Sequence, residues 1–259
     1  MPRGGQGKGI SRSIRNRLRF SVLRRGLDSG AVLVDRAPAD RVAVLAPHPD
    51  DDVIGCGGTL YKHRQAGEAV SVIYLTDGSR GNAWASGSSA ELAAIRRREA
   101  QEAARVLGVE ALVFLDYPDG ELAASGTVAD RVLESLHATL AQCVFLPSLV
   151  DDHPDHLATN RIFTALAPRL DARTTVFAYE VWTPLAPNRL VDISGAAAVK
   201  EEAIRKHASQ IRLVDYAGAM LGLNRFRSLP TACGRGFCEA FLAADARTYA
   251  RLVKEVLGL

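Results

Sequence analysis

From residue 41 onward, short apolar runs alternate with longer segments in which apolar residues recur every three or four positions. The short runs are rich in Val, Ile, Leu and Phe, as strands are, and the longer segments have the period of amphipathic helices. Such alternation predicts an α/β fold, a Rossmann-like sandwich with a mainly parallel central sheet flanked by helices. Strands are expected at 42–46, 69–76, 111–116, 143–147 and 174–181, and helices near 57–67, 89–108, 127–141 and 155–170.

The last third of the chain has a less regular pattern. Residues 196–210 are expected to form a helix, and residues 215–227 a weaker one that suits a wall or lid of a site. Residues 236–243 are expected to form a late strand. With 259 residues, 47% of them hydrophobic, the chain is long enough for one well-buried domain. We therefore predict an N-terminal extension over residues 1–35 and a single domain over residues 36–259.

The first 27 residues carry eight basic side chains and no acidic one. Between residues 10 and 27, apolar residues recur about every four positions with arginines between them, which predicts a basic amphipathic helix. Three roles stay open for it: docking on its own domain, peripheral contact with an anionic membrane surface, or a transit peptide. The rest of the chain holds 24 basic and 29 acidic residues, and this negative balance disfavours a nucleic-acid partner.

The four cysteines form neither a CxxC pair nor the spacing of a disulfide framework, which is typical of reduced thiols in the cytoplasm. No segment approaches the run of about 18 apolar residues that a transmembrane helix needs. We therefore expect a cytoplasmic protein, either free or bound peripherally to the inner face of the membrane. The sequence leaves its oligomeric state open.

Two clusters of histidine and aspartate lie about a hundred residues apart. The first, within Pro47–Gly58, directly follows the predicted strand 42–46, and the second, Asp151–His156, comes shortly after the predicted strand 143–147. Ligand sites in parallel sheets lie at the carboxyl ends of the strands, so the fold should bring these clusters together. Imidazole and carboxylate groups are usual ligands of Zn²⁺, and a catalytic site leaves one coordination position for water. The clusters therefore predict a catalytic metal site.

The spacing within the clusters suggests how the ligands are arranged. His48 and Asp51 are three residues apart across a strand-to-helix turn, so both side chains can point at one ion. Pro154 suits the first turn of a helix, because its missing N–H costs nothing there. His153 and His156 then lie about one turn apart on one face. One of the two can bind the metal while the other acts on the substrate.

Asp50 lies between the two candidate ligands of the first cluster. The alternation of side chains should turn it away from them but keep it near a water molecule, where a carboxylate serves as a general base. A metal lowers the pKa of its water from about 15.7 to about 7, so a modest base suffices. The implied reaction is hydrolysis of an amide or ester, with the metal and a cationic His153 stabilising the oxyanion. Alternatively, Asp50, Asp51 and Asp52 simply cap the following helix.

These motifs make the chain resemble the PIG-L (LmbE-like) deacetylase family, whose hallmarks are a His-Pro-Asp-Asp loop and a later His-Pro-Asp-His. The resemblance runs from about Val42 to Phe241 and includes the shorter motifs Leu75–Gly78 and His207–Gln210. It implies an LmbE-like fold and the family's usual reaction, removal of an acetyl group from an N-acetylglucosamine unit. The expected substrate is a small amino sugar, within a glycoconjugate, a lipid-linked sugar or a precursor of a secondary metabolite.

The resemblance also implies a role for each residue of the two clusters. Zn²⁺, or another divalent metal such as Fe²⁺, would be held by His48, Asp51 and His156. Asp50 would be the general base, and His153 would stabilise the oxyanion or protonate the leaving amine.

Further positions bear on the substrate. Arg96 and Asp119 match family positions implicated in substrate binding, and Asp77, in the Leu75–Gly78 motif, is a further candidate for substrate binding or an ordinary turn residue. Trp84 and Tyr117 are candidates for stacking on a sugar ring. The chain departs from the family at two places. It has Asp52 where many members have Glu, and Asp151 where some members have Tyr.

Other functions are compatible with parts of the pattern. The same residues would serve an amidase that acts on another N-acyl substrate. A non-haem iron oxygenase would use His48, Asp50 and either His153 or His156 as a facial triad, but such enzymes usually have antiparallel double sheets. A dinucleotide-binding module would need a GxGxxG motif, which the glycines of residues 55–58 do not make.

Overall fold

The computed structural model describes residues 30–81 and 88–259. In this part of the chain the strands are β1 (Val32–Val34), β2 (Arg41–Ala46), β3 (Ala69–Thr76), β4 (Ala111–Tyr117), β5 (Cys143–Pro147), β6 (Thr175–Tyr179), β7 (Arg189–Asp192) and β8 (Cys238–Asp245). They form one sheet in the order β1-β7-β8-β6-β5-β2-β3-β4. All neighbours pair in parallel except β8, which is antiparallel to both β6 and β7. The predicted mainly parallel sheet is therefore confirmed.

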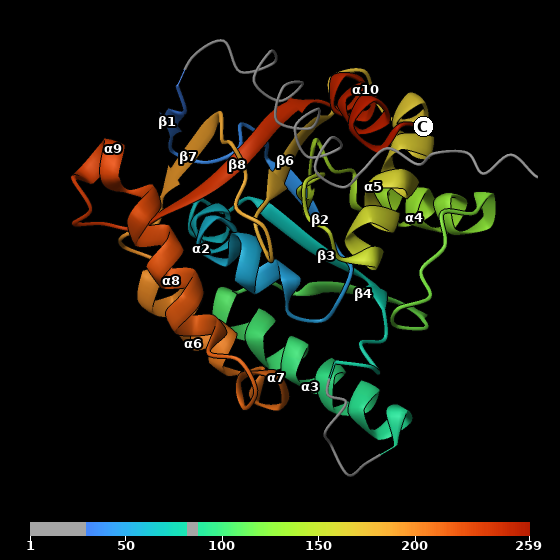
Figure 1. Cartoon of the computed structure of the whole chain (residues 1–259), viewed down its shortest axis with the longest axis horizontal. Coiled ribbons are helices and arrows are strands. Elements are labelled where there is room, and N and C mark those ends of the chain that lie inside the picture. Colours follow the sequence, from blue (N-terminus) through green and yellow to red (C-terminus); the bar gives the residue numbers. More distant parts are fainter. Residues whose placement is uncertain (1–29, 82–87) are drawn as a thin grey trace, which may run out of the picture.

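Helices cover both faces of the sheet, as predicted. They are α2 (Asp51–Gln65), α3 (Ser89–Leu107), α4 (Gly126–Thr139), α5 (Pro154–Leu166), the 3₁₀ helix η1 (Ala167–Arg169), α6 (Ala197–Arg205), α7 (Ala208–Ile211), α8 (Tyr216–Arg227), α9 (Leu229–Ala232) and α10 (Ala246–Leu257). Helices α2, α3, α6 and α8 lie on one side of the sheet, and α4, α5 and α10 on the other (Figure 1). Each side buries its own apolar cluster against the sheet, and these two layers hold the strand ends in place.

Helix α3 illustrates how local sequence sets the boundaries. Ser88 and Glu91 form a capping box, in which each side chain accepts a hydrogen bond from the backbone N–H of the other residue. At the other end Gly108 adopts a left-handed conformation with φ 72°, which a glycine takes without strain. The helix predicted over residues 89–108 is thus confirmed to within one residue.

Helix α2 begins at Asp51, six residues earlier than the sequence predicted. The error came from the glycines of its first half, which usually indicate a loop. Here they allow a close approach, because a Cβ on Gly55 would overlap the ring of Tyr179 and one on Gly58 would overlap Ile193. The helix therefore lies unusually near the sheet, and its first turn carries carboxylates straight from the end of β2.

A buried ion pair fixes the middle of α2. The Glu239 carboxylate of β8 accepts hydrogen bonds from the backbone N–H groups of Gly58 and Thr59 at 2.9 and 2.7 Å. It also pairs with Lys200 of α6 at 2.6 Å, and both charged side chains are fully buried. A late strand and a late helix thus anchor the helix on which the first cluster lies.

The C-terminal third contains more structure than was predicted. The helix expected at 196–210 is divided into α6 and α7 by a turn at Lys206, the weaker helix is α8, and the late strand is β8. Four elements were missed: the short strands β1 and β7, the short helix α9, and α10, whose buried Tyr249, Ala250 and Val253 have helical spacing.

The predicted extension concerns mostly residues outside the described ones. The basic helix expected between residues 10 and 27 falls there entirely. Strand β1 lies inside the 1–35 segment and pairs with β7, so the sheet already includes residues of that segment. No helix of the described residues is long and apolar enough to cross a membrane.

The chain order of the strands creates a reversal at β2. From β2 the chain runs outward through β3 to β4, and then returns to place β5 on the other side of β2. The loops after β2 and β5 therefore diverge to opposite faces of the sheet and leave a crevice between them. Both histidine clusters lie in this crevice.

Candidate metal and catalytic site

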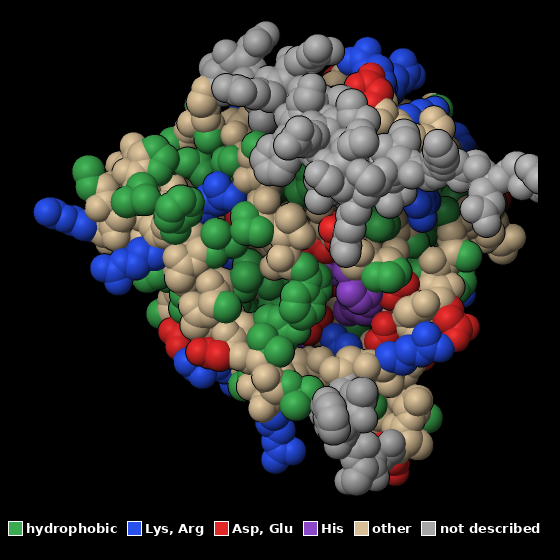
Figure 2. Space-filling model, viewed as in Figure 1, with side chains coloured by type: hydrophobic (Ala, Val, Ile, Leu, Met, Phe, Trp, Pro, Cys, Tyr) green, Lys and Arg blue, Asp and Glu red, His purple; other side chains and the backbone are tan. Residues whose placement is uncertain are grey.

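A cleft of about 420 Å³ opens at the carboxyl edge of the sheet. Its walls come from the segments that follow β2, β3, β4, β5 and β6, and from α7 and α8. Figure 2 shows histidine at the bottom of this hollow, with hydrophobic side chains on one side and charged side chains on the other. The two clusters predicted to converge do so, because the rings of His48 and His156 lie 5.5 Å apart.

Three predicted ligands meet at the bottom of the cleft. One oxygen of Asp51, Oδ2, lies 3.1 Å from Nδ1 of His48 and 3.3 Å from Nε2 of His156. Two ligand atoms about 2.0–2.1 Å from a tetrahedral Zn²⁺ are about 3.3 Å apart, so these separations fit such an ion. All three side chains are buried, and they come from the end of β2, the first turn of α2 and the first turn of α5.

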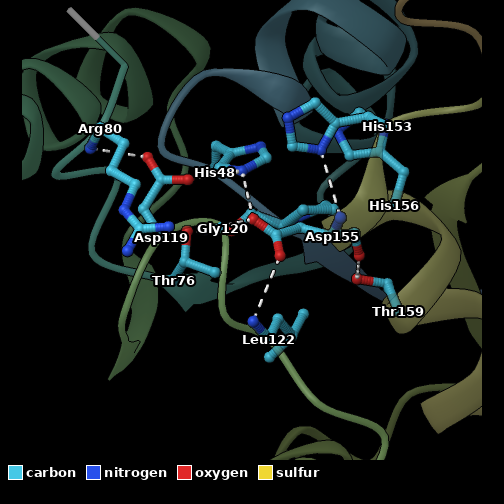
Figure 3. A network of polar contacts seen from close by, with 12 residues as sticks. His48, Thr76, Arg80, Asp119, Gly120, Leu122, His153, Asp155, His156 and Thr159 are labelled. Carbon is cyan, nitrogen blue, oxygen red and sulfur yellow. Dashed lines mark hydrogen bonds and ion pairs between the residues drawn. The ribbon is translucent and has the colours of Figure 1, made fainter. Parts of the chain in front are cut away.

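Each of the two histidines has a buried aspartate behind it. Nε2 of His48 lies 3.0 Å from Asp155, whose carboxylate also accepts hydrogen bonds from the N–H groups of Gly120 and Leu122 (Figure 3). Nδ1 of His156 lies 3.2 Å from Asp151, which is fully buried. Carboxylates in this position fix the ring orientation and tautomer of metal-binding histidines.

Sequence reasoning did not assign these roles to Asp151 and Asp155. Their place in an acidic run gave no signal of which ring nitrogen each would face. One general rule could have identified them. A metal-binding histidine usually has a carboxylate partner, and each cluster contains aspartates that were not assigned as ligands.

The donor set fits a cation on two observations. Both ring nitrogens of His156 are buried and make no well-aligned hydrogen bond within the described residues. The buried aspartates 50, 51, 119, 151 and 155 all lie around the cleft, and Arg96 is the buried arginine that faces them. A divalent cation would both use the lone pair of His156 and balance the excess negative charge.

Two other groups of potential ligands share His48, one with His153 and His156 and the other with Asp119 and Asp155. The oxygens of those aspartates already accept hydrogen bonds from backbone N–H groups, among them that of Arg80. In the set around Asp51, one carboxylate oxygen lies within 3.3 Å of both His48 and His156, and the ring nitrogens of His156 make no well-aligned hydrogen bond within the described residues. We therefore take this set as the better candidate for the metal.

Asp50 lines the cleft together with His48 and Asp51 and is paired with an arginine. Nη2 of Arg96 lies 2.9 Å from Oδ1 of Asp50, and both side chains are buried. Burial raises the pKa of Asp50 to about 6, although the charge of Arg96 opposes the shift. Asp50 precedes α2 but makes no side-chain capping bond, so the alternative role as a simple helix cap does not describe it.

His153 stands across the cleft at the start of α5. Its Nδ1 accepts a hydrogen bond from the backbone N–H of Asp155 at 3.2 Å, while Pro154 occupies the first helical position as predicted. An acceptor Nδ1 puts the proton on Nε2 in the neutral ring. Burial, together with the nearby His48 and His156, lowers the pKa of His153. The geometry therefore favours a neutral donor, where the sequence analysis expected a cation.

Comparisons with known proteins identify the family. A family model described as PIG-L, GlcNAc-PI de-N-acetylase, matches residues 43–167. The diacetylchitobiose deacetylase of Thermococcus kodakarensis is 32% identical over 186 residues, which cover 66% of this chain and 70% of that protein. The chain belongs to the PIG-L family.

Two more proteins similar to this chain are a deacetylase and a hydratase. The N,N'-diacetylchitobiose deacetylase of Pyrococcus horikoshii has a similar structure, with a TM-score of 0.72 and 28% identity, covering 94% of this chain and 97% of that one. The 4-oxalmesaconate hydratase of Pseudomonas putida is 28% identical over 200 residues, covering 69% of this chain and 77% of that protein. The resemblance inferred from the motifs and the LmbE-like fold are both confirmed.

Of the candidate substrate-binding residues outside the two clusters, two line the cleft and one does not. Arg96 and Asp119 line the cleft, and Arg96 also donates to the backbone carbonyls of Gly78 and Pro49. Asp77 does not line it. Its carboxylate accepts a hydrogen bond from the backbone N–H of Asp119 at 3.2 Å, so it holds the turn that carries Asp119.

The two departures from the PIG-L pattern have different surroundings. Asp52 lies below the cleft, where it accepts a hydrogen bond from the hydroxyl of Tyr74 and where burial raises its pKa to about 7. Asp151 holds His156, as described above. Of the aromatic residues singled out in the sequence, Trp84 lies outside the described residues, and Tyr117 packs against the core beside α4.

Proposed function

We propose that the protein is a Zn²⁺-dependent hydrolase that removes the acetyl group from an N-acetylglucosamine-type amino sugar. The observation that carries this proposal is the position of Asp50 and His153, which flank the set of His48, Asp51 and His156 within one cleft. A base and a hydrogen-bond donor on either side of a metal set are what amide hydrolysis requires. The named deacetylases among the relatives support the same reaction.

His48, Asp51 and His156 would hold the metal. When bound, a Zn²⁺ ion supplies Lewis acidity, which makes a water molecule a good nucleophile near neutral pH and polarises a carbonyl group. Zinc is the natural candidate because two imidazoles, one carboxylate and an open position are a usual catalytic zinc set.

Asp50 takes a proton from the attacking water in the proposed reaction. Arg96 holds Oδ1 of Asp50, so Oδ2 is the oxygen that receives the proton. A carboxylate with a pKa of about 6 is ionised at neutral pH yet more basic than an ordinary aspartate. As the C–N bond breaks, Asp50 returns this proton to the nitrogen, and the products are acetate and a free amine.

His153 stabilises the negative charge that develops on the carbonyl oxygen. Because Nδ1 accepts from the backbone N–H of Asp155, Nε2–H is the group that can donate into the cleft. The fixed backbone contact orients the ring before the substrate binds, so little reorganisation is needed.

The test is acetate release from N-acetylglucosamine, measured with protein stripped by chelator and then resupplied with Zn²⁺. Activity should vanish on chelation and return with the metal. Asp50→Asn should lower kcat by about 10²–10⁴-fold and leave bound zinc nearly unchanged. His153→Ala should also lower kcat, whereas His137→Ala, an exposed histidine on α4, serves as the matched control and should be active.

Two results would overturn the proposal. Activity that does not change on chelation would show that the reaction needs no metal. Near-normal turnover by Asp50→Asn would show that Asp50 is not the general base. Since one relative is named a hydratase, a protein that adds water to an unsaturated acid but releases no acetate would be assigned to that reaction instead.

A further inference from the structure

One wall of the cleft is apolar and aromatic, and nothing in the proposed chemistry uses it. It consists of Ile54, Val181, Trp182, Val214 and Tyr216. The lining also includes polar groups, among them Arg80, Asp119 and Gly120. Figure 2 shows this division, with hydrophobic side chains on one side of the histidines and charged ones on the other.

Trp182 is the most unusual member of this wall. Its side chain is 51% exposed, although a large aromatic ring gains most from being buried. The ring of Tyr216 meets it at 5.7 Å with an interplanar angle of 73°, an edge-to-face contact. Such a contact supports the tryptophan without covering both of its faces.

The backbone beneath Trp182 is fixed at several points. Its N–H donates to Asp151 at 3.0 Å, the same carboxylate that holds the ring of His156. Glu180 accepts a hydrogen bond from the N–H of Leu185 at 2.8 Å, and Arg227 pairs with Glu180 and donates to the carbonyl of Leu185 at 2.7 Å. The exposed ring therefore belongs to a rigid segment that starts next to a metal ligand.

We infer that Trp182 and Tyr216 form a stacking platform for a second sugar ring, next to the ring that carries the acetamido group. The substrate class would then be an amino-sugar oligosaccharide rather than a single sugar. This inference rests on the proposed deacetylase function. A pyranose has an apolar C–H face and hydroxyls at its edge, so it fits a cleft with one aromatic wall and one hydrogen-bonding wall.

The experiment compares one and two sugar rings in the same variants. Acetate release is measured from N-acetylglucosamine and from N,N'-diacetylchitobiose, with an octyl glycoside of N-acetylglucosamine as a third substrate. Trp182→Ala should raise KM for the disaccharide about tenfold, the size of one good stacking contact, and change the monosaccharide reaction by less than about twofold. Trp182→Phe should recover part of the loss because it restores a ring.

Phe226 provides the matched control. It is 60% exposed on α8 but does not line the cleft, so Phe226→Ala should leave all three substrates unaffected. An equal loss on the monosaccharide and the disaccharide would overturn the platform, as would no loss at all. A loss confined to the octyl glycoside would assign the wall to an apolar group instead of a sugar.

A binding measurement separates this inference from the proposed function. Calorimetry with the deacetylated disaccharide needs no turnover, and Trp182→Ala should weaken its binding about tenfold relative to the unchanged protein. If no acetate is released from any substrate, the proposed function fails while the binding result still stands. If Trp182→Ala binds the disaccharide as tightly as the unchanged protein, the platform fails whatever the activity.

Discussion

Replacing Asp151 by asparagine tests how the metal site is held. One oxygen of Asp151 accepts from the backbone N–H of His153 at 3.1 Å. The other accepts from the N–H of Trp182 at 3.0 Å and faces Nδ1 of His156 at 3.2 Å. In Asp151→Asn one oxygen becomes an NH₂ group, so at least one of these donors faces another donor in a fully buried place.

The structure sets the size of two effects. Leaving a buried N–H without an acceptor costs about 1–3 kcal/mol of folding free energy. Loss of the carboxylate behind a metal-binding histidine typically weakens metal binding about 10–100-fold, which corresponds to about 1.4–2.7 kcal/mol. We therefore expect a protein that still folds but binds Zn²⁺ about 10–100-fold more weakly.

The assay is a competition between the protein and a chelator for Zn²⁺, with unfolding by denaturant measured in parallel. Asp171→Asn is the matched control, because it removes the same charge from an exposed turn that lies away from the cleft. If Asp151→Asn binds zinc within about twofold as tightly as the unchanged protein, the reasoning is refuted. Such a loss of affinity is smaller than the range expected when a metal-binding histidine loses its carboxylate partner. His156→Ala should lose more zinc than either Asp151→Asn or His153→Ala, and the reverse order would exchange the two histidines.

Four other predictions concern stability and the N-terminal segment. Gly55→Ala should destabilise the protein by about 1–3 kcal/mol in denaturant unfolding, because its Cβ would overlap an aromatic ring. Gly222→Ala, in open space on α8, should stabilise it by about 0.5–1 kcal/mol. Lys200→Met should cost about 3–5 kcal/mol, because it leaves the charge of Glu239 buried and unpaired; an unchanged unfolding midpoint would contradict this. Deleting residues 1–27 should leave acetate release intact and, if this segment contacts a membrane, reduce the membrane-bound fraction after cell fractionation. An unchanged fraction would remove the membrane role.

The sequence was most informative where its signals were periodic or clustered. The alternation of strands and helices predicted the parallel sheet, and the position of the clusters after two strands predicted their convergence. Both inferences rest on rules of chain topology that need no atomic detail. These rules placed His48 and Asp51 beside the second cluster, whereas the choice of His156 rather than His153 as a ligand came from the resemblance to the family.

The sequence did not show which residues far apart in the chain contact each other, or how their side chains are oriented. The glycines of α2 looked like a loop because their purpose, close packing on Tyr179, lies in a strand more than a hundred residues away. Asp151 and Asp155 could not be matched to their histidines without knowing the orientation of each ring. In the same way Trp182, in an irregular segment after β6, gave no sign that it lies at the cleft.

The place of β8 in the sheet has a consequence for how the chain matures on the ribosome. This strand follows all the other described strands in the sequence, yet it lies between β6 and β7 and connects the β1–β7 pair to the other strands. It also brings Glu239 to α2. A nascent chain that stops before β8 therefore lacks the strand that joins the two parts of the sheet and the carboxylate that anchors α2, so the site can be completed only after β8 has been made.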